Sequence, residues 1–214
     1  MEDIYHLDGY NKKALLFFHH LTDEPVFFNI MKLSSAYIGN YLWAPVTIPI
    51  IMLIALSTLK KKSKDKTNIC VNMLQAFIVM FTSLFIAGIL VKVLKSYSEM
   101  PRPYCSLDAS LIRDFVVHKT AKCFRSFPSG HTAYTAAIVF SLWPIMSSLT
   151  KYIASIVLVL VCISRLSMAM HYPADVIGSL ILTTVIVFTV RKLTEHHANR
   201  LKTRLVSVCN CLMK

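Results

Sequence analysis

The sequence predicts an all-α fold, a polytopic transmembrane helix bundle with five or six spans and an interfacial amphipathic N-terminal region. Hydrophobic residues make up 55% of the 214-residue chain and charged residues only 16%, whereas soluble domains carry about 25% charged residues. The mean hydropathy of +0.56 is high for a soluble protein and also indicates a membrane protein. Several apolar runs also reach the length of about 20 residues that a helix needs to cross a bilayer.

Five apolar runs are expected to form transmembrane helices, and they cover residues 41–59, 69–94, 132–149, 152–170 and 174–190. We therefore expect a transmembrane bundle over residues 41–192. An interfacial segment over residues 1–40 would precede it, and a basic cytoplasmic tail over residues 193–214 would follow it.

The N-terminal residues 14–38 contain two apolar stretches that are separated by Asp23, Glu24 and Pro25. A charge at the bilayer centre costs about 2.5–3.5 kcal/mol on insertion scales, so two adjacent carboxylates argue against a span. Two short amphipathic helices that lie in the interface are favoured. A sixth span through these residues is the alternative.

The formal net charge is +12, from 23 Lys and Arg against 11 Asp and Glu. Nucleic-acid binding is disfavoured, because many of the charges flank apolar segments and no soluble basic domain is left outside them. Basic clusters at residues 60–66 and 191–204 are expected on the cytoplasmic side. The loops over residues 95–130 and 165–173 would then face outward.

Three groups of polar residues fall at the outer ends of the expected spans. The first contains Lys95 and Arg102, the second is the run Pro-Ser-Gly-His that ends at His131, and the third covers residues 164–175. His131 and His171 are 40 residues apart. Two spans joined by a short turn use about that many residues, so the chain returns His171 to the depth of His131.

Each group has an ordinary structural explanation when it is taken alone. Lys95 and Arg102 can be snorkelling residues at a helix end, Ser129 can cap a helix, and Asp175 can be favoured by a helix dipole. Together the groups meet the needs of phosphoryl transfer. This reaction requires cations around the phosphate oxygens, an in-line nucleophile and an acid at the leaving oxygen.

The local spacing within the groups suits that chemistry. Ser129 and Gly130 stand where a helix begins, and free N–H groups at such a position bind anions. His171 and Asp175 are four residues apart, with Pro173 suited to the first helical position between them. A carboxylate in that first turn can fold back to fix the imidazole tautomer.

These groups resemble the three motifs of the type-2 phosphatidic-acid phosphatase superfamily, which also includes the vanadium haloperoxidases. The family pattern is K-x(6)-R-P, then P-S-G-H, then S-R-x(5)-H-x(3)-D, and every defining residue is present in this order. The resemblance implies a distinct role for each residue. His131 would protonate the leaving group, and His171 would attack phosphorus with Asp175 as its orienting partner. The residues that would bind the phosphate are Lys95, Arg102, Arg165, Ser129 and Gly130.

The resemblance implies a membrane lipid phosphatase that works through a phosphohistidine without a metal or other cofactor, at the outer face of a bacterial inner membrane. Candidate substrates are lipid A, undecaprenyl diphosphate, phosphatidylglycerophosphate and phosphatidic acid. One alternative is a lipid phosphotransferase that uses the same intermediate. Another is a non-catalytic binder or transporter of anionic lipids, because charges inside membranes also mark ion pathways.

Two cysteines, Cys105 and Cys123, flank the outward loop. If that face is oxidising, a disulfide between them would close the loop; two free thiols are the alternative. The histidine pairs at positions 19–20 and 196–197 lack converging metal-ligand spacing, and His118 is expected to be a surface residue.

Overall fold

The computed structural model describes residues 9–39, 66–112 and 123–212, and every regular element within them is helical. The helices are α2 (Tyr10–His20), α3 (Pro25–Gly39), α5 (Lys66–Ser98), α6 (Pro103–Ser106), α7 (Gly130–Leu142), α8 (Ser148–Ser167) and α9 (Pro173–Leu212). Within the described residues, three short 3₁₀ turns accompany them, η2 (Leu21–Asp23), η3 (Ala109–Leu111) and η5 (Trp143–Ile145). The predicted all-α class is confirmed for this part of the chain.

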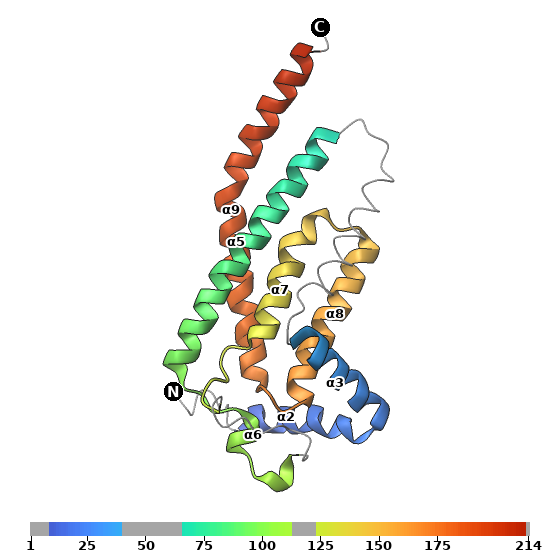
Figure 1. Cartoon of the computed structure of the whole chain (residues 1–214), viewed down its shortest axis with the longest axis vertical. Helices are drawn as coiled ribbons and strands as arrows, with labels where there is room; N and C mark the ends of the chain where they lie inside the picture. Colours follow the sequence, from blue (N-terminus) through green and yellow to red (C-terminus); the bar gives the residue numbers. More distant parts are fainter. Residues whose placement is uncertain (1–8, 40–65, 113–122, 213–214) are drawn as a thin grey trace.

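Helices α5, α7 and α9 pack against one another, and α8 closes the bundle on the side of α7 (Figure 1). Helix α7 is almost completely enclosed, and its Ala133, Ala136 and Ala137 have no exposed area. Small side chains allow helix backbones to approach closely, as is common between membrane helices. The hydroxyl of Thr183 on α9 donates to the carbonyl oxygen of Ala133 at 3.3 Å, which joins the two helices by a polar contact.

The outer surface of the bundle is apolar. Phe81 and Phe85 on α5, and Ile181, Val185 and Phe188 on α9, are mostly exposed. A surface of this kind is unfavourable in water but is suited to the hydrocarbon region of a bilayer. Among the described residues, three helical segments are long and apolar enough to cross a membrane: Val71–Ser106, Ser148–Ser167 and Pro173–Glu195.

The span expected over residues 132–149 differs from the structure. Helix α7 has only 13 residues and gives way at Leu142 to the turn η5, which contains Pro144. A helix of 13 residues rises about 20 Å, which is less than the hydrocarbon core of about 30 Å. The next helix then begins at Ser148, where the Ser147 hydroxyl accepts a hydrogen bond from the Thr150 N–H at 3.2 Å. The turn between the two helices therefore covers residues 143–147.

The other expected spans can be compared with the helices wherever the structure describes the residues. Helices α5, α8 and α9 contain most or all of the runs 69–94, 152–170 and 174–190. The run 41–59 lies outside the described residues, so the full count of five or six spans stays a prediction. The expected tail over residues 193–214 is helical as far as Leu212, because α9 continues without a glycine or proline that would end it.

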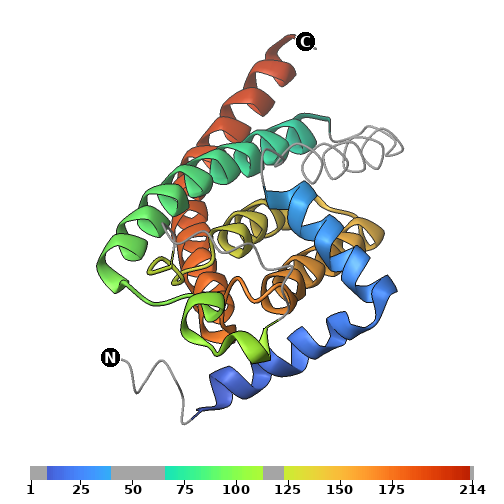
Figure 2. The ribbon, with the colours of Figure 1, turned by 60° about the horizontal axis from the view of Figure 1, so that its bottom comes forward.

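The N-terminal region forms two helices, α2 and α3, which are separated near Asp23 and Glu24 as expected. Helix α2 crosses the end of the bundle, and α3 turns back along α8 (Figures 1 and 2). Their interfacial position relative to a bilayer stays a prediction. Helix α6 and the turn between α8 and α9 lie at the same end of the bundle as α2, opposite the start of α5 and the end of α9 (Figure 1).

Candidate active site

The three polar groups identified in the sequence meet at one end of the bundle. The backbone N–H of Ser129 donates to the carbonyl oxygen of Asp175 at 3.4 Å, which ties the start of α7 to the start of α9. Lys95, near the end of α5, donates through Nζ to the carbonyl oxygen of Arg125 at 2.8 Å. His131 lies in the first turn of α7, two residues beyond Ser129. The expected convergence of these groups is therefore observed.

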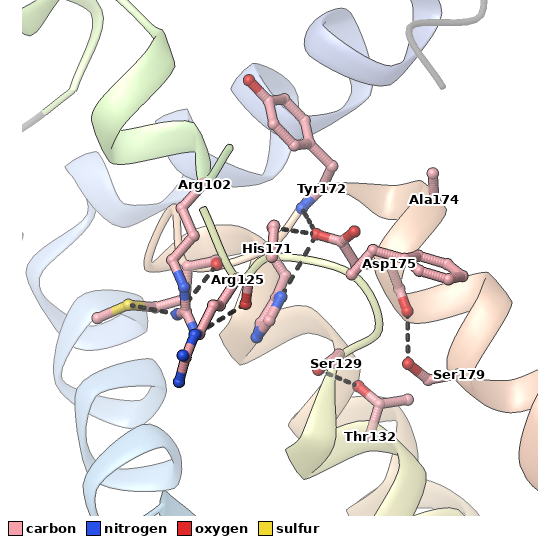
Figure 3. A network of polar contacts seen from close by, with 12 residues as sticks. Arg102, Arg125, Ser129, Thr132, His171, Tyr172, Ala174, Asp175 and Ser179 are labelled. Carbon is pink, nitrogen blue, oxygen red and sulfur yellow. Dashed lines mark hydrogen bonds and ion pairs between the residues drawn. The ribbon is translucent and has the colours of Figure 1, made fainter. Parts of the chain in front are cut away.

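His171 and Asp175 form the centre of the cluster (Figure 3). His171 is 2% exposed and Asp175 is completely buried. The distance from His171 Nδ1 to Asp175 Oδ2 is 3.3 Å. The same carboxylate oxygen accepts the Ser126 hydroxyl at 2.5 Å and the Tyr172 N–H at 2.8 Å. Because the carboxylate can only accept, the Nδ1 atom carries the proton and the Nε2 atom is left with its lone pair.

Burial lowers the pKa of His171 to about 4, since an imidazolium is poorly solvated in an enclosed site. The Asp175 carboxylate opposes this shift, whereas the positive charges of Lys95 and Arg102 add to it. The imidazole is therefore neutral at physiological pH. A neutral imidazole with a free Nε2 is the form that can act as a nucleophile.

Two arginines place buried N–H groups at the site. Arg102 donates through Nη1 to the carbonyl oxygen of Met170 and through Nη2 to that of Arg125, each at 3.4 Å. Within the described part of the chain, Arg102 Nε and Arg165 Nη2 are buried and have no hydrogen-bond partner. A buried donor without a partner costs about 1–3 kcal/mol, or more when it is charged. An anion that binds between these groups would remove that cost.

The start of α7 adds further donors. Ser129 is completely buried, and its hydroxyl accepts from Thr132 Oγ1 at 3.0 Å instead of capping the backbone of α7. The first N–H groups of a helix lack partners inside that helix, and Gly130 is the first residue of α7, so its backbone N–H stands at a position that favours anions. A side chain at Gly130 would meet Val91 and Tyr134 only at ordinary contact distances, 3.7 and 3.8 Å.

The structure adds residues that the sequence did not reveal. Ser126 has no exposed area and bonds the Asp175 carboxylate, while the Ser179 hydroxyl donates to the Asp175 carbonyl oxygen at 2.5 Å. Gly178 packs against Phe127, and a Cβ atom there would lie 2.5 Å from the ring of Phe127, so that ring would have to move. Isolated serines and a helical glycine carry no spacing signal, so only the folded chain identifies them.

The disulfide between Cys105 and Cys123 is present, with a Cα–Cα distance of 5.7 Å. The carbonyl oxygen of Cys123 accepts the backbone N–H of Arg102 at 2.7 Å. The bridge therefore attaches the loop that leads to Ser126 to the segment that carries Arg102. His118 lies outside the described residues.

The long apolar helices of the bundle define an integral membrane protein. The PAP2 superfamily family model matches residues 76–197, which is more than half of the chain. The chain belongs to the PAP2 superfamily.

Two solved structures resemble the chain. LpxE of Aquifex aeolicus is 20% identical, with a TM-score of 0.53, over 84% of this chain and 93% of the other. A transmembrane PAP2-type phosphatidylglycerolphosphate phosphatase of Bacillus subtilis is 24% identical, with a TM-score of 0.44, over 87% and 94%. The first likeness supports the fold. No curated protein sequence matches the chain significantly.

Proposed function

We propose that the protein removes phosphate from a membrane lipid through a covalent phosphohistidine on His171. The observation that carries this proposal is the buried His171–Asp175 pair beside two guanidinium groups, each of which has one buried N–H donor without a partner among the described residues. The pair leaves Nε2 free to attack, and the unpaired donors of Arg102 and Arg165 suit the oxygens of a phosphate. Arginine is well matched to phosphate because its planar fork can donate two parallel hydrogen bonds.

The reaction would run in two displacements at phosphorus. In the first, His171 Nε2 forms a bond to phosphorus while the bond to the lipid oxygen breaks, and His131 donates a proton to that oxygen. The imidazole now carries positive charge, which the Asp175 carboxylate stabilises. In the second displacement, water loses a proton to His131 and its oxygen attacks phosphorus. The P–N bond breaks, and phosphate and neutral His171 are regenerated.

The positive charge that this chemistry needs would come from Lys95, Arg102 and Arg165, with further hydrogen-bond donors from the Ser129 hydroxyl and the Gly130 N–H. Three cationic side chains around the equatorial oxygens fulfil the electrostatic task that metal ions perform in other phosphoryl-transfer enzymes. We therefore propose that turnover is independent of metal ions and of any other cofactor.

We also propose that the site faces the outside, in a bacterial inner membrane. Two features support this orientation. The basic residues 191–204 belong to the end of α9 that lies opposite the site, and such residues favour the cytoplasmic side (Figure 1). The Cys105–Cys123 disulfide lies at the end with the site, and disulfides persist in oxidising compartments.

Lipid specificity can be tested with purified protein in detergent and four lipids: phosphatidic acid, phosphatidylglycerophosphate, undecaprenyl diphosphate and lipid A. We expect release of inorganic phosphate from at least one of them, at the same rate with and without EDTA. Mass spectrometry of the lipids would reveal phosphate that moves to a second lipid instead, which would favour the phosphotransferase alternative. Inactivity on all four lipids would argue against the proposal, and loss of activity in EDTA would contradict metal independence.

The pH dependence of kcat/KM provides a separate check, since its limbs report ionisations of the free enzyme. His171 must be neutral to attack, so activity is lost as pH falls through its pKa. Because that pKa is lowered to about 4, the acid limb should lie well below the ordinary histidine value of about 6.5. Lys95→Met removes one of the positive charges that lower the pKa and should shift this limb upward. A wild-type acid limb at the ordinary value would contradict the neutral buried imidazole.

A further inference from the structure

Helix α2 buries one narrow stripe of three residues against the bundle. Asn11, Leu15 and His19 are 2%, 0% and 2% exposed, and they are spaced four residues apart along one face of the helix. The other face is exposed and includes Tyr10 and Phe17. Two of the three enclosed residues are polar, and a polar side chain is buried at little cost only when it is hydrogen-bonded.

Both polar residues bond the backbone on either side of the loop that carries His171. The His19 Nδ1–H donates to the carbonyl oxygen of Ser167, the last residue of α8, at 2.7 Å. The Asn11 Oδ1 accepts the N–H of Ala174, the second residue of α9, at 3.0 Å. The two partners of the first bond are 148 positions apart in the chain, and those of the second bond are 163 positions apart. Helix α2 therefore holds the last turn of α8 and the first turn of α9.

The two bonded backbone groups are ones that the helices cannot pair by themselves. Carbonyl groups in the last turn of a helix and N–H groups in the first turn have no partner inside that helix. His19 supplies the missing donor at the end of α8, and Asn11 supplies the missing acceptor at the start of α9. Between them, Leu15 packs in a cluster with Leu166 and Tyr172, the residue that follows His171.

The loop itself has a backbone that depends on its surroundings. Ala169 adopts a φ of 48°, a conformation that residues with a side chain seldom adopt and that is kept only when neighbouring contacts impose it. Inside the loop, the N–H groups of Met170 and His171 share the carbonyl oxygen of Arg165, at 3.1 and 3.2 Å. These two hydrogen bonds hold the loop against the end of α8. The hydrogen bond that Asn11 Oδ1 accepts holds the other end of the loop at the start of α9.

We infer that α2 is a positioning element of the active site, in which Asn11 and His19 hold the His171 loop in the geometry for attack on phosphorus. This inference rests on the proposed phosphatase function. Helix α2 lies outside residues 76–197, the part that matches the family. Neither side chain has a part in the proposed steps at phosphorus, so both act through the backbone of the loop.

The test compares alanine variants with variants that keep the bonding atom. Asn11→Ala and His19→Ala remove the acceptor and the donor. Asn11→Asp keeps an oxygen in the position of Oδ1, and His19→Asn keeps an N–H in the position of Nδ1. His20→Ala, the exposed neighbour of His19, is the matched control. Turnover is measured in detergent on the lipid that the wild type hydrolyses fastest, and the unfolding temperature of each variant is recorded beside it.

We expect each alanine variant to lower kcat about 10- to 100-fold, because a displacement of about 1 Å at a reacting group has an effect of that size. KM should change less than about threefold, because the cations that hold phosphate are not altered. Asn11→Asp and His19→Asn should recover most of the lost kcat, and His20→Ala should equal the wild type.

Normal kcat in Asn11→Ala and His19→Ala would overturn the positioning role. So would an equal loss in His19→Ala and His19→Asn, or a loss explained entirely by a smaller folded fraction. Comparison with His171→Ala distinguishes a failure of the positioning role from a failure of the proposed phosphatase function. If His171→Ala is inactive while the α2 variants are normal, only the positioning role fails. If His171→Ala keeps its turnover, the proposed function fails, and this inference fails with it.

Discussion

Replacing His171 by alanine should abolish phosphate release from the lipid substrate, with a loss on the order of 10⁴-fold or more, as for other enzymes that lose a covalent nucleophile. The buried imidazole is the group whose Nε2 is left free by the contact of Nδ1 with Asp175, so alanine leaves no nucleophile in its place. The initial rate of phosphate release in detergent measures this loss. His131→Ala should also be inactive, because it removes the acid for the leaving oxygen.

A labelling measurement and a control variant make the His171 prediction specific to the mechanism. Acid-labile phosphate should become attached to wild-type protein after rapid quenching with labelled lipid, and it should be absent from His171→Ala. His20→Ala serves as the control, because it removes an exposed imidazole from the same end of the bundle. Normal turnover by purified His171→Ala would exclude the phosphohistidine mechanism.

Replacing Arg165 by methionine should lower kcat/KM by roughly 10²- to 10³-fold, the usual effect of removing one donor to a developing charge. Arg165 is 4% exposed, and its Nη2 atom has no hydrogen-bond partner among the described residues. A buried charge without a paired anion is costly. The ligand-free variant should therefore unfold at the same temperature as the wild type or at a higher one.

Vanadate separates the contribution of Arg165 to binding from its contribution to the fold. This anion can adopt the five-coordinate geometry expected at phosphorus, so it should inhibit the enzyme and raise the unfolding temperature of the wild type. A ligand at 100 times its Kd stabilises a protein by about 2.7 kcal/mol. Arg165→Met should lose most of this shift, whereas Arg200→Met, which changes an exposed arginine far along α9, should retain it. An equal vanadate shift in Arg165→Met and the wild type would remove Arg165 from the anion site.

The residues of the candidate site could be predicted from the sequence because their spacing is itself structural information. Pro173 starts α9 and the four-residue step brings Asp175 back to His171, so one helical turn creates that contact. That the chain brings His171 back to the depth of His131 could be predicted from the number of residues that two helices use. The placement of both cysteines in one loop left a disulfide and two free thiols as alternatives, and the structure has the disulfide.

Other features depend on contacts between distant segments, which no local pattern records. Ser126 reaches the Asp175 carboxylate across 49 positions of sequence. The apolar run over residues 132–149 could not show that α7 would end at Leu142. That end is stabilised by Arg191 on α9, which donates through Nη2 to the carbonyl oxygens of Phe140 and Ser141 at 2.8 and 3.0 Å. The buried stripe of α2 likewise has meaning only when its backbone partners are known.

The opposite placement of the site and of the far end of α9 has a practical consequence for handling the protein. An affinity handle or a fluorescent reporter joined after α9 would be separated from the His171 loop by the length of the bundle (Figure 1). Such a fusion leaves access to the candidate active site unobstructed.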